Sequence, residues 1–155
     1  MTNSTVPGVP GEIVFPSLLR AARGAYGRTI QSRLFAAGFE DVPRNGAFVL
    51  GGMANHGGSA AHLVRELGIT KQAASQLIDT LVMRGYLERS INANDRRRMT
   101  IDVTERGRAA ADIVRAGVLA VDAEVAGMIT PAELAGLRAG LKALGAIRAR
   151  AIAAS

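Results

Sequence analysis

Residues 67–89 read LGITKQAASQLIDTLVMRGYLER, and this stretch decides the fold. Thr70 can cap a helix because its side-chain oxygen accepts a hydrogen bond from the first free amides, and Gly85 provides the left-handed geometry that ends one. The apolar residues between them recur at helical spacing and are Ala73, Ala74, Leu77, Ile78 and Leu81. A shorter helix over 59–67, ended by Gly68, is expected just before. Two short helices joined across a tight turn predict a helix-turn-helix.

A β-hairpin is expected directly after these helices. Residues 86–90 and 99–103 are typical of two short strands, because Ile101 and Val103 alternate with polar residues. The intervening segment, 91–98, is polar and turn-forming and ends in three consecutive arginines. A hairpin beside a helix-turn-helix would form a wing.

Amphipathic patterns predict further helices on both sides. An apolar residue every four positions, beginning at Leu18, indicates a helix over 13–38. The segment 43–55 is the least regular of the expected helices, because each of its glycines costs about 0.5–1 kcal/mol relative to alanine. An Ala-rich helix is expected over 105–127, and the capping box Thr130-Pro131-Ala132-Glu133 starts a last helix. The fold class is therefore mainly α with a small β-hairpin wing.

Composition limits the function classes. The chain has 155 residues and no cysteine, which excludes disulfides, thiolate metal sites and thiol-based peroxide sensing. It contains no secretory signal and no apolar stretch long enough to span a membrane, so we expect a cytoplasmic protein without a membrane partner. The formal charge of +6, with a pI near 11.0, favours a polyanionic partner such as duplex DNA.

The second helix of the helix-turn-helix offers a polar face to such a partner. Behind the cap at Thr70, the side chains opposite Leu77 and Leu81 are Lys71, Gln72, Ser75, Gln76 and Asp79. Lysine can donate to guanine O6 or N7, and glutamine can pair bidentately with adenine. The alternative is an ordinary solvated helix face.

The wing tip strengthens the case for nucleic acid. The three adjacent positive charges of Arg96, Arg97 and Arg98 repel one another, and binding of a polyanion would offset this repulsion. Arginine is also favoured in a narrow minor groove, where the potential is more negative. Asn94 and Asp95 precede them, and we expect Asp95 to orient Arg96 or Arg97 by a bidentate pair. An unstructured basic loop is the alternative at this position.

The order of these elements resembles the MarR family of regulators. The resemblance is strongest over 59–107, where LGITKQAASQLIDTLVMRGYLER and NDRRRMTIDVTERG look like that family's recognition helix, wing tip and entry into the fifth helix. It implies a homodimeric repressor on a pseudo-palindromic operator, often released by a small phenolic or anionic molecule. The glycine-rich segment 43–55 departs from the family's more regular pattern.

The resemblance also implies how the chain is divided. It would make 39–104 the DNA-binding winged helix-turn-helix and 13–38 with 105–153 a helical dimerisation region, whereas residues 1–12 are expected to form a flexible N-terminal tail because they carry prolines and glycines and no apolar period. Candidate dimer contacts are Leu18 in the first helix and, in the last helix, Leu134, Leu137, Leu141 and Leu144. Leucines at steps of three and four form the narrow seam expected where one helix packs against a partner helix.

Other function classes find little support in the residues. We expect that the protein is not an enzyme. The segment from Gly46 to Gly52 has the glycine spacing of a phosphate-binding loop, but the lysine and the hydroxyl residue that such a loop requires are missing. We expect no cofactor and no metal site, since His56 and His62 have only Glu66 nearby as a further ligand. A winged helix that binds another protein instead of DNA remains the alternative, and the three wing arginines oppose it.

Overall fold

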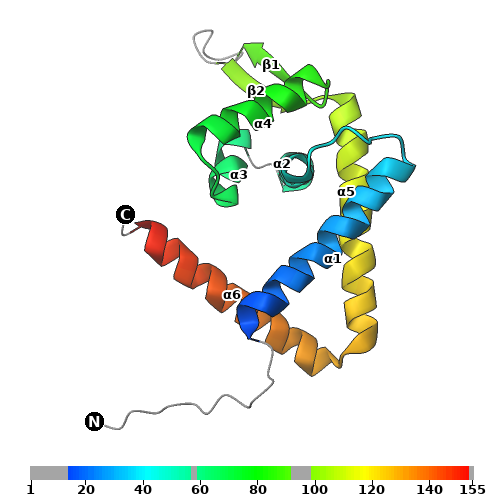
Figure 1. The fold of residues 1–155 in the computed structure, drawn as a ribbon, viewed down its shortest axis with the longest axis vertical. Helices are drawn as coiled ribbons and strands as arrows, with labels where there is room; N and C mark the ends of the chain where they lie inside the picture. Colours follow the sequence, from blue (N-terminus) through cyan, green and yellow to red (C-terminus); the bar gives the residue numbers. More distant parts are fainter. Residues whose placement is uncertain (1–13, 57–58, 92–98, 154–155) are drawn as a thin grey trace. The chain divides into compact units, whose positions relative to one another are not determined.

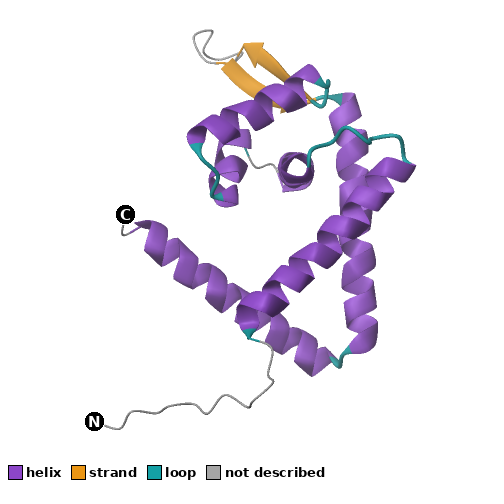
Figure 2. Cartoon of the chain, viewed as in Figure 1, coloured by secondary structure: helices purple, strands orange, loops and turns teal. Residues whose placement is uncertain are grey.

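The computed structural model describes residues 14–56, 59–91 and 99–153, and within these ranges the chain forms six helices and one hairpin (Figures 1 and 2). The elements are α1 (Phe15–Ala36), α2 (Arg44–His56), α3 (Ala60–Leu67), α4 (Lys71–Met83), β1 (Leu87–Ile91), β2 (Met99–Val103), α5 (Glu105–Met128) and α6 (Pro131–Ala153). The predicted fold class, mainly α with a small hairpin, is confirmed. The chain divides into two compact units, residues 1–117 and 118–155.

Local capping sets the helix-turn-helix within the first unit. The side-chain oxygen of Ser59 accepts a hydrogen bond from the His62 amide at 3.2 Å, which starts α3. Thr70 starts α4 in the same way through the Ala73 amide at 3.2 Å. Gly68, with φ of 66°, ends α3 in the left-handed conformation that the sequence predicted.

The end of α4 is a Schellman motif. The Tyr86 amide donates to the Leu81 carbonyl at 2.9 Å, and the amide of Gly85, at φ of 75°, donates to the Val82 carbonyl at 3.0 Å. Because Tyr86 is used in this turn, the first strand begins at Leu87, one residue later than the pattern predicted.

Close packing explains the glycines of α2. This helix contacts α1, α3, α4 and β2, and Figure 1 views it nearly along its axis. A Cβ atom added at Gly52 would lie 2.5 Å from Leu63 Cδ2 in α3, and one at Gly46 would lie 3.0 Å from Leu81 Cδ2 in α4. Glycine lowers the helical propensity of α2, but it has no side chain and so lets the neighbouring helices approach the α2 backbone closely. The fully buried side chains that share this core are Leu34, Val49, Leu50, Leu81, Tyr86 and Leu87.

The hairpin is antiparallel and is tied to α5 at its base. Leu87 pairs with Val103 at the base, and Ile91 pairs with Met99 at the far end. The Thr104 hydroxyl donates to the Gly85 carbonyl at 2.6 Å and in turn accepts from the Gly107 amide at 3.0 Å. The first turn of α5 therefore shares hydrogen bonds with the turn that leads from α4 into β1.

The second unit contains the end of α5, a short turn and α6. The capping box is confirmed, since the Thr130 amide donates to Glu133 Oε2 at 2.8 Å and the Glu133 amide donates to Thr130 Oγ1 at 3.3 Å. These bonds hold the pKa of the Glu133 carboxyl below its usual value, chiefly through the Thr130 amide. Among the described residues, no helix is long and apolar enough to cross a membrane.

Candidate nucleic-acid interface

The polar face of α4 is exposed over the residues that the sequence singled out. Lys71, Gln72, Ser75 and Gln76 are all solvent-exposed, whereas Leu77, Ile78 and Leu81 on the opposite face are buried. Thr70 is exposed as well, but its side-chain oxygen accepts the Ala73 amide, so it serves as the helix cap. The helix is thus held by its apolar side and leaves amide, hydroxyl and ammonium groups free to face a ligand.

An ion pair connects this face to the wing. Asp79 lies on the exposed side of α4, and its Oδ1 accepts a hydrogen bond from Arg89 Nη2 on β1. Sequence reasoning placed Asp79 on the polar face but missed Arg89. Asp79 and Arg89 are ten residues apart, on either side of a turn, and this spacing alone does not predict that the two side chains meet.

The tip of the predicted wing lies outside the described residues. Asn94, Asp95, Arg96, Arg97 and Arg98 all fall in the segment 92–98, so their roles stay predictions. The described stem of the hairpin carries a polar network on one face. Thr100 Oγ1 lies 2.7 Å from Ser90 Oγ and donates to Asp102 Oδ2 at 3.2 Å, and Ser90 Oγ also donates to that carboxylate.

A polar cluster lies at the base of the hairpin. The Tyr86 hydroxyl donates to Asp41 Oδ1, and Arg106 Nη2 donates both to Asp41 Oδ1 at 3.2 Å and to the Tyr86 hydroxyl at 3.0 Å. Arg106 also stacks over the Tyr86 ring, 4.7 Å from its centroid. Arg84 donates to the Asp41 carbonyl. The cluster joins the loop after α1 to the end of α4, the start of β1 and the start of α5.

Hydrogen bonding and burial shift the pKa values in this cluster. The Tyr86 hydrogen bond, helped by Arg106, lowers the pKa of Asp41 below its usual value. Burial, together with the same hydrogen bond, raises the pKa of Tyr86, so this hydroxyl remains a donor at neutral pH. Sequence reasoning missed the cluster, although a tyrosine in a buried position generally needs a partner for its hydroxyl.

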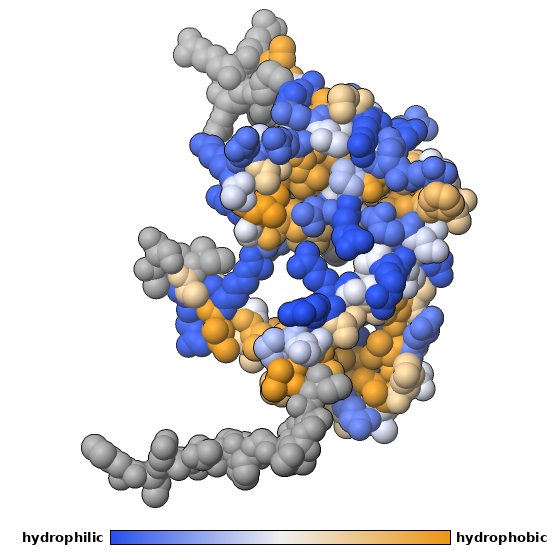
Figure 3. All heavy atoms as spheres, viewed as in Figure 1, coloured by the Kyte–Doolittle hydropathy of each residue, from blue (hydrophilic) through white to orange (hydrophobic). Residues whose placement is uncertain are grey.

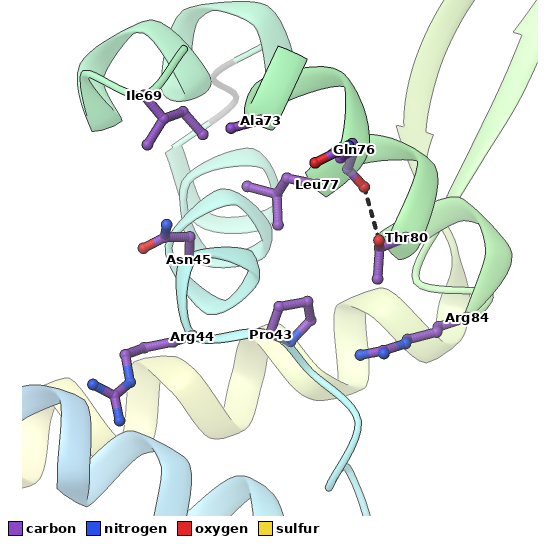
Figure 4. Close-up of a pocket in the computed structure, with 9 residues that line it drawn as sticks. All are labelled: Pro43, Arg44, Asn45, Ile69, Ala73, Gln76, Leu77, Thr80 and Arg84. Carbon is purple, nitrogen blue, oxygen red and sulfur yellow. Dashed lines mark hydrogen bonds between the residues drawn. The ribbon is translucent and has the colours of Figure 1, made fainter. Parts of the chain in front are cut away.

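A cavity of about 430 Å³ lies between the start of α2 and α4 (Figure 4). Ile69, Ala73 and Leu77 give it apolar walls, and Arg44 and Arg84 are its basic lining residues, although the Arg44 guanidinium points away from the apolar walls in Figure 4. Its remaining lining residues are Pro43, Asn45, Gln76 and Thr80, and the Thr80 hydroxyl donates to the Gln76 carbonyl at 2.7 Å. Gln76 therefore belongs both to this cavity and to the exposed face of α4.

The candidate dimer leucines are largely uncovered in the single chain. Leu18 in α1 is 47% exposed, and in α6 Leu137, Leu141 and Leu144 are 46%, 46% and 45% exposed. Leu134 is half-buried. Figure 3 shows hydrophobic atoms at the surface along α6. Their role in a dimer stays a prediction.

Comparisons with known proteins agree with this architecture. The model of the MarR family matches residues 40–98. Among solved structures, wild-type MarR from E. coli in its apo form is 23% identical, with a TM-score of 0.61, over 86% of this chain and 98% of that one. FabT from Streptococcus pneumoniae in complex with DNA is 18% identical, with a TM-score of 0.72, over 87% of this chain and 95% of that one.

A third similar structure contains a small molecule. The Mycobacterium tuberculosis MarR family protein Rv2887, in complex with salicylic acid, is 25% identical, with a TM-score of 0.59, over 88% of this chain and 99% of that one. No curated protein sequence matches the chain. The family-model match over residues 40–98 and these solved structures together show that the chain has the fold of MarR-family winged helix-turn-helix regulators.

Proposed function

We propose that the protein is a transcriptional repressor that binds duplex DNA sequence-specifically, as a homodimer on a pseudo-palindromic operator. The observation that carries the proposal is the exposed face of α4, where Lys71, Gln72 and Gln76 point away from a buried apolar side. Each bidentate contact of such a side chain with a base edge discriminates between bases by about 1–3 kcal/mol. FabT, which has a similar fold, is solved in complex with DNA.

The leucine seam of α6 supports the homodimer. Leu137, Leu141 and Leu144 each keep almost half of their surface exposed at 45–46%, and burying apolar surface yields about 25 cal/mol per Å². A second copy that covers this seam would bring two α4 helices into one particle. If they lie about 34 Å apart, both enter successive major grooves on one side of the duplex.

The wing supplies the second contact in this proposal. Arg96, Arg97 and Arg98 would insert into the flanking minor groove or neutralise phosphates, with Asn94 and Asp95 holding the turn. These contacts would strengthen binding to every duplex, whereas α4 would choose the sequence.

A small aromatic acid is the proposed effector, and the cavity beside α4 is its proposed site. Its volume of about 430 Å³ lies within the range of small-molecule pockets. Leu77 and its apolar neighbours would hold a ring, and the Arg44 side chain, which points outward in Figure 4, would turn inward to pair with the carboxylate. Rv2887 is solved with salicylic acid. Because Gln76 lines the same cavity, an occupant would displace a side chain that we propose contacts DNA.

Selection of bound duplexes from a random pool tests the proposed function. We expect a palindromic sequence, because a homodimer presents two equivalent α4 helices. This one experiment would then report DNA binding, twofold symmetry and half-site spacing. A mobility shift of the selected duplex, with random duplex as competitor at two salt concentrations, should give sequence-selective and salt-sensitive retention. No retention even at low salt would refute DNA binding and favour a module that binds protein.

Salicylate titration of the protein–DNA complex tests the effector separately. The wild type should release the duplex, and Arg44→Ala should need a higher salicylate concentration while binding DNA equally well in its absence. Equal sensitivity of both proteins would remove this cavity from the proposal.

A further inference from the structure

Asp79 is the only acidic residue of α4, and it lies among the residues that we propose read the bases. It follows Ser75 by four residues and Gln72 by seven, which places all three on one side of the helix. Its side chain is 60% exposed. DNA carries one phosphate charge for about every 1.7 Å of its axis, so an uncompensated carboxylate on this face would oppose binding.

Arg89 compensates this charge from a different element. Its Nη2 donates to Asp79 Oδ1, and it lies on β1, opposite Ile101 of β2, so the pair ties the reading helix to the stem of the wing. The Arg89 side chain is still 44% exposed. A guanidinium has five N–H donors in a planar fork, and the carboxylate contact engages one nitrogen.

We propose that Asp79 and Arg89 form a phosphate clamp, in which Asp79 holds the Arg89 guanidinium so that it binds a backbone phosphate of the duplex. The phosphate would lie between the groove that α4 enters and the groove that the wing enters. This inference rests on the proposed DNA binding and adds a contact to it. Arg89 is the contacting residue, and Asp79 is a positioning residue.

The chemistry of the pair fits a phosphate. Guanidinium and phosphate form parallel, charge-assisted hydrogen bonds, and a guanidinium held by a carboxylate loses less rotational freedom when it binds. Phosphate contacts fix the register of a protein on the duplex without selecting sequence. Since the pair spans α4 and β1, one such contact would set the position of both elements on DNA.

A double-substitution series tests the clamp. Dissociation constants are measured by fluorescence anisotropy for Arg89→Ala, Asp79→Asn, the double variant and the wild type, with the selected operator and a random duplex of equal length, over a salt series. Arg115→Ala, which removes an exposed arginine from α5, is the matched control for lost charge. Melting temperatures should stay within a few degrees of the wild type, because exposed ion pairs stabilise little.

The expected pattern has two parts. Arg89→Ala should weaken binding to both duplexes by about tenfold or more, and should reduce the salt slope by about 0.9 for each lost phosphate contact. Asp79→Asn should weaken binding in the wild-type background, where it releases Arg89. In the Arg89→Ala background the same change should strengthen binding, because it then removes only an unpaired negative charge.

Three results would overturn the clamp. They are an unchanged salt slope in Arg89→Ala, a slope loss that Arg115→Ala reproduces, and an Asp79→Asn effect of the same sign in both backgrounds. If Asp79→Asn instead alters preference at one base pair and keeps the slope, Asp79 accepts from a cytosine amine and the clamp is wrong. A wild type that binds no duplex refutes the proposed function itself, whereas the three results above refute only the clamp.

Discussion

Gly107 in the first turn of α5 is buried against the hairpin, and its replacement by alanine tests how closely the two elements meet. An added Cβ would lie 2.1 Å from the Tyr86 carbonyl oxygen and 2.8 Å from Val103 Cγ1. Ordinary contacts of a Cβ begin at 3.4 Å, so the start of α5 and the Tyr86 backbone would have to separate by about 1 Å. The obstacle is backbone, which cannot change rotamer to make room.

The expected loss follows from two opposing effects. Overpacking of this kind costs about 1–3 kcal/mol, and occasionally more, whereas the better helix propensity of alanine returns at most about 1 kcal/mol. Strain in the Thr104 hydrogen bonds to Gly85 and Gly107 adds to the cost. We therefore expect Gly107→Ala to lower the free energy of unfolding by about 2 kcal/mol, or the melting temperature by about 4–8 °C.

Gly127 provides the matched control, because it lies in the same helix and has nothing within 4 Å of an added Cβ. Gly127→Ala should stabilise by about 0.5–1 kcal/mol. Both variants are compared by urea unfolding and thermal melting at one protomer concentration, since association would shift the midpoint. If Gly107→Ala is as stable as Gly127→Ala, the close contact between α5 and the Tyr86 backbone is wrong.

Further predictions concern the polar cluster, the wing, α4 and α6. Because the pKa of Asp41 is lowered in the folded chain, its stabilising contribution is complete above its ordinary pKa of 3.8 and is lost as the pH falls through the lowered value. The difference in unfolding free energy between the wild type and Asp41→Asn should therefore be constant well above pH 3.8 and shrink as the pH falls below 3.8, and a difference that stays constant below this pH would contradict the linkage. Replacing Arg96 and Arg97 by alanine should weaken binding to all duplexes and flatten the salt slope in a mobility shift, and an unchanged slope would exclude the wing from the interface. Gln72→Ala should relax selection at one position of each half-site, costing about 1–3 kcal/mol there, and an unaltered selected sequence would mean that Gln72 faces solvent. Leu141→Lys should shift the protein to monomer in analytical ultracentrifugation, whereas Arg138→Ala on the same helix should not.

Features that depend on neighbours in sequence could be predicted. Thr70 and Ser59 cap their helices within three residues, the capping box at Thr130 closes over the same distance, and Gly68 and Gly85 take the positive φ that ends a helix. Such signals require no knowledge of tertiary structure. They were sufficient to locate the helix-turn-helix and the polar face of α4.

Features that depend on distant residues could not be predicted. Asp41 and Tyr86 are 45 residues apart, and Arg106 lies a further 20 residues along, so no local pattern links them. The glycines of α2 reduce helix propensity, and the close approach of residues from other elements, Leu63, Leu81 and Val114, explains why they are tolerated. Arg89 was overlooked because its partner lies on another element and the turn between them decides whether they meet.

The bonds of Thr104 to Gly85 and Gly107 have a consequence for how a signal could reach DNA. They couple the end of α4, the base of the hairpin and the start of α5. The stem of the hairpin therefore moves together with α4 and not independently of it. In the proposed dimer, binding of an effector would then separate or rotate the two DNA-binding regions as rigid bodies. It would not change the orientation of the wing relative to α4. Operators that differ in the distance between half-sites should accordingly differ in how readily they are released.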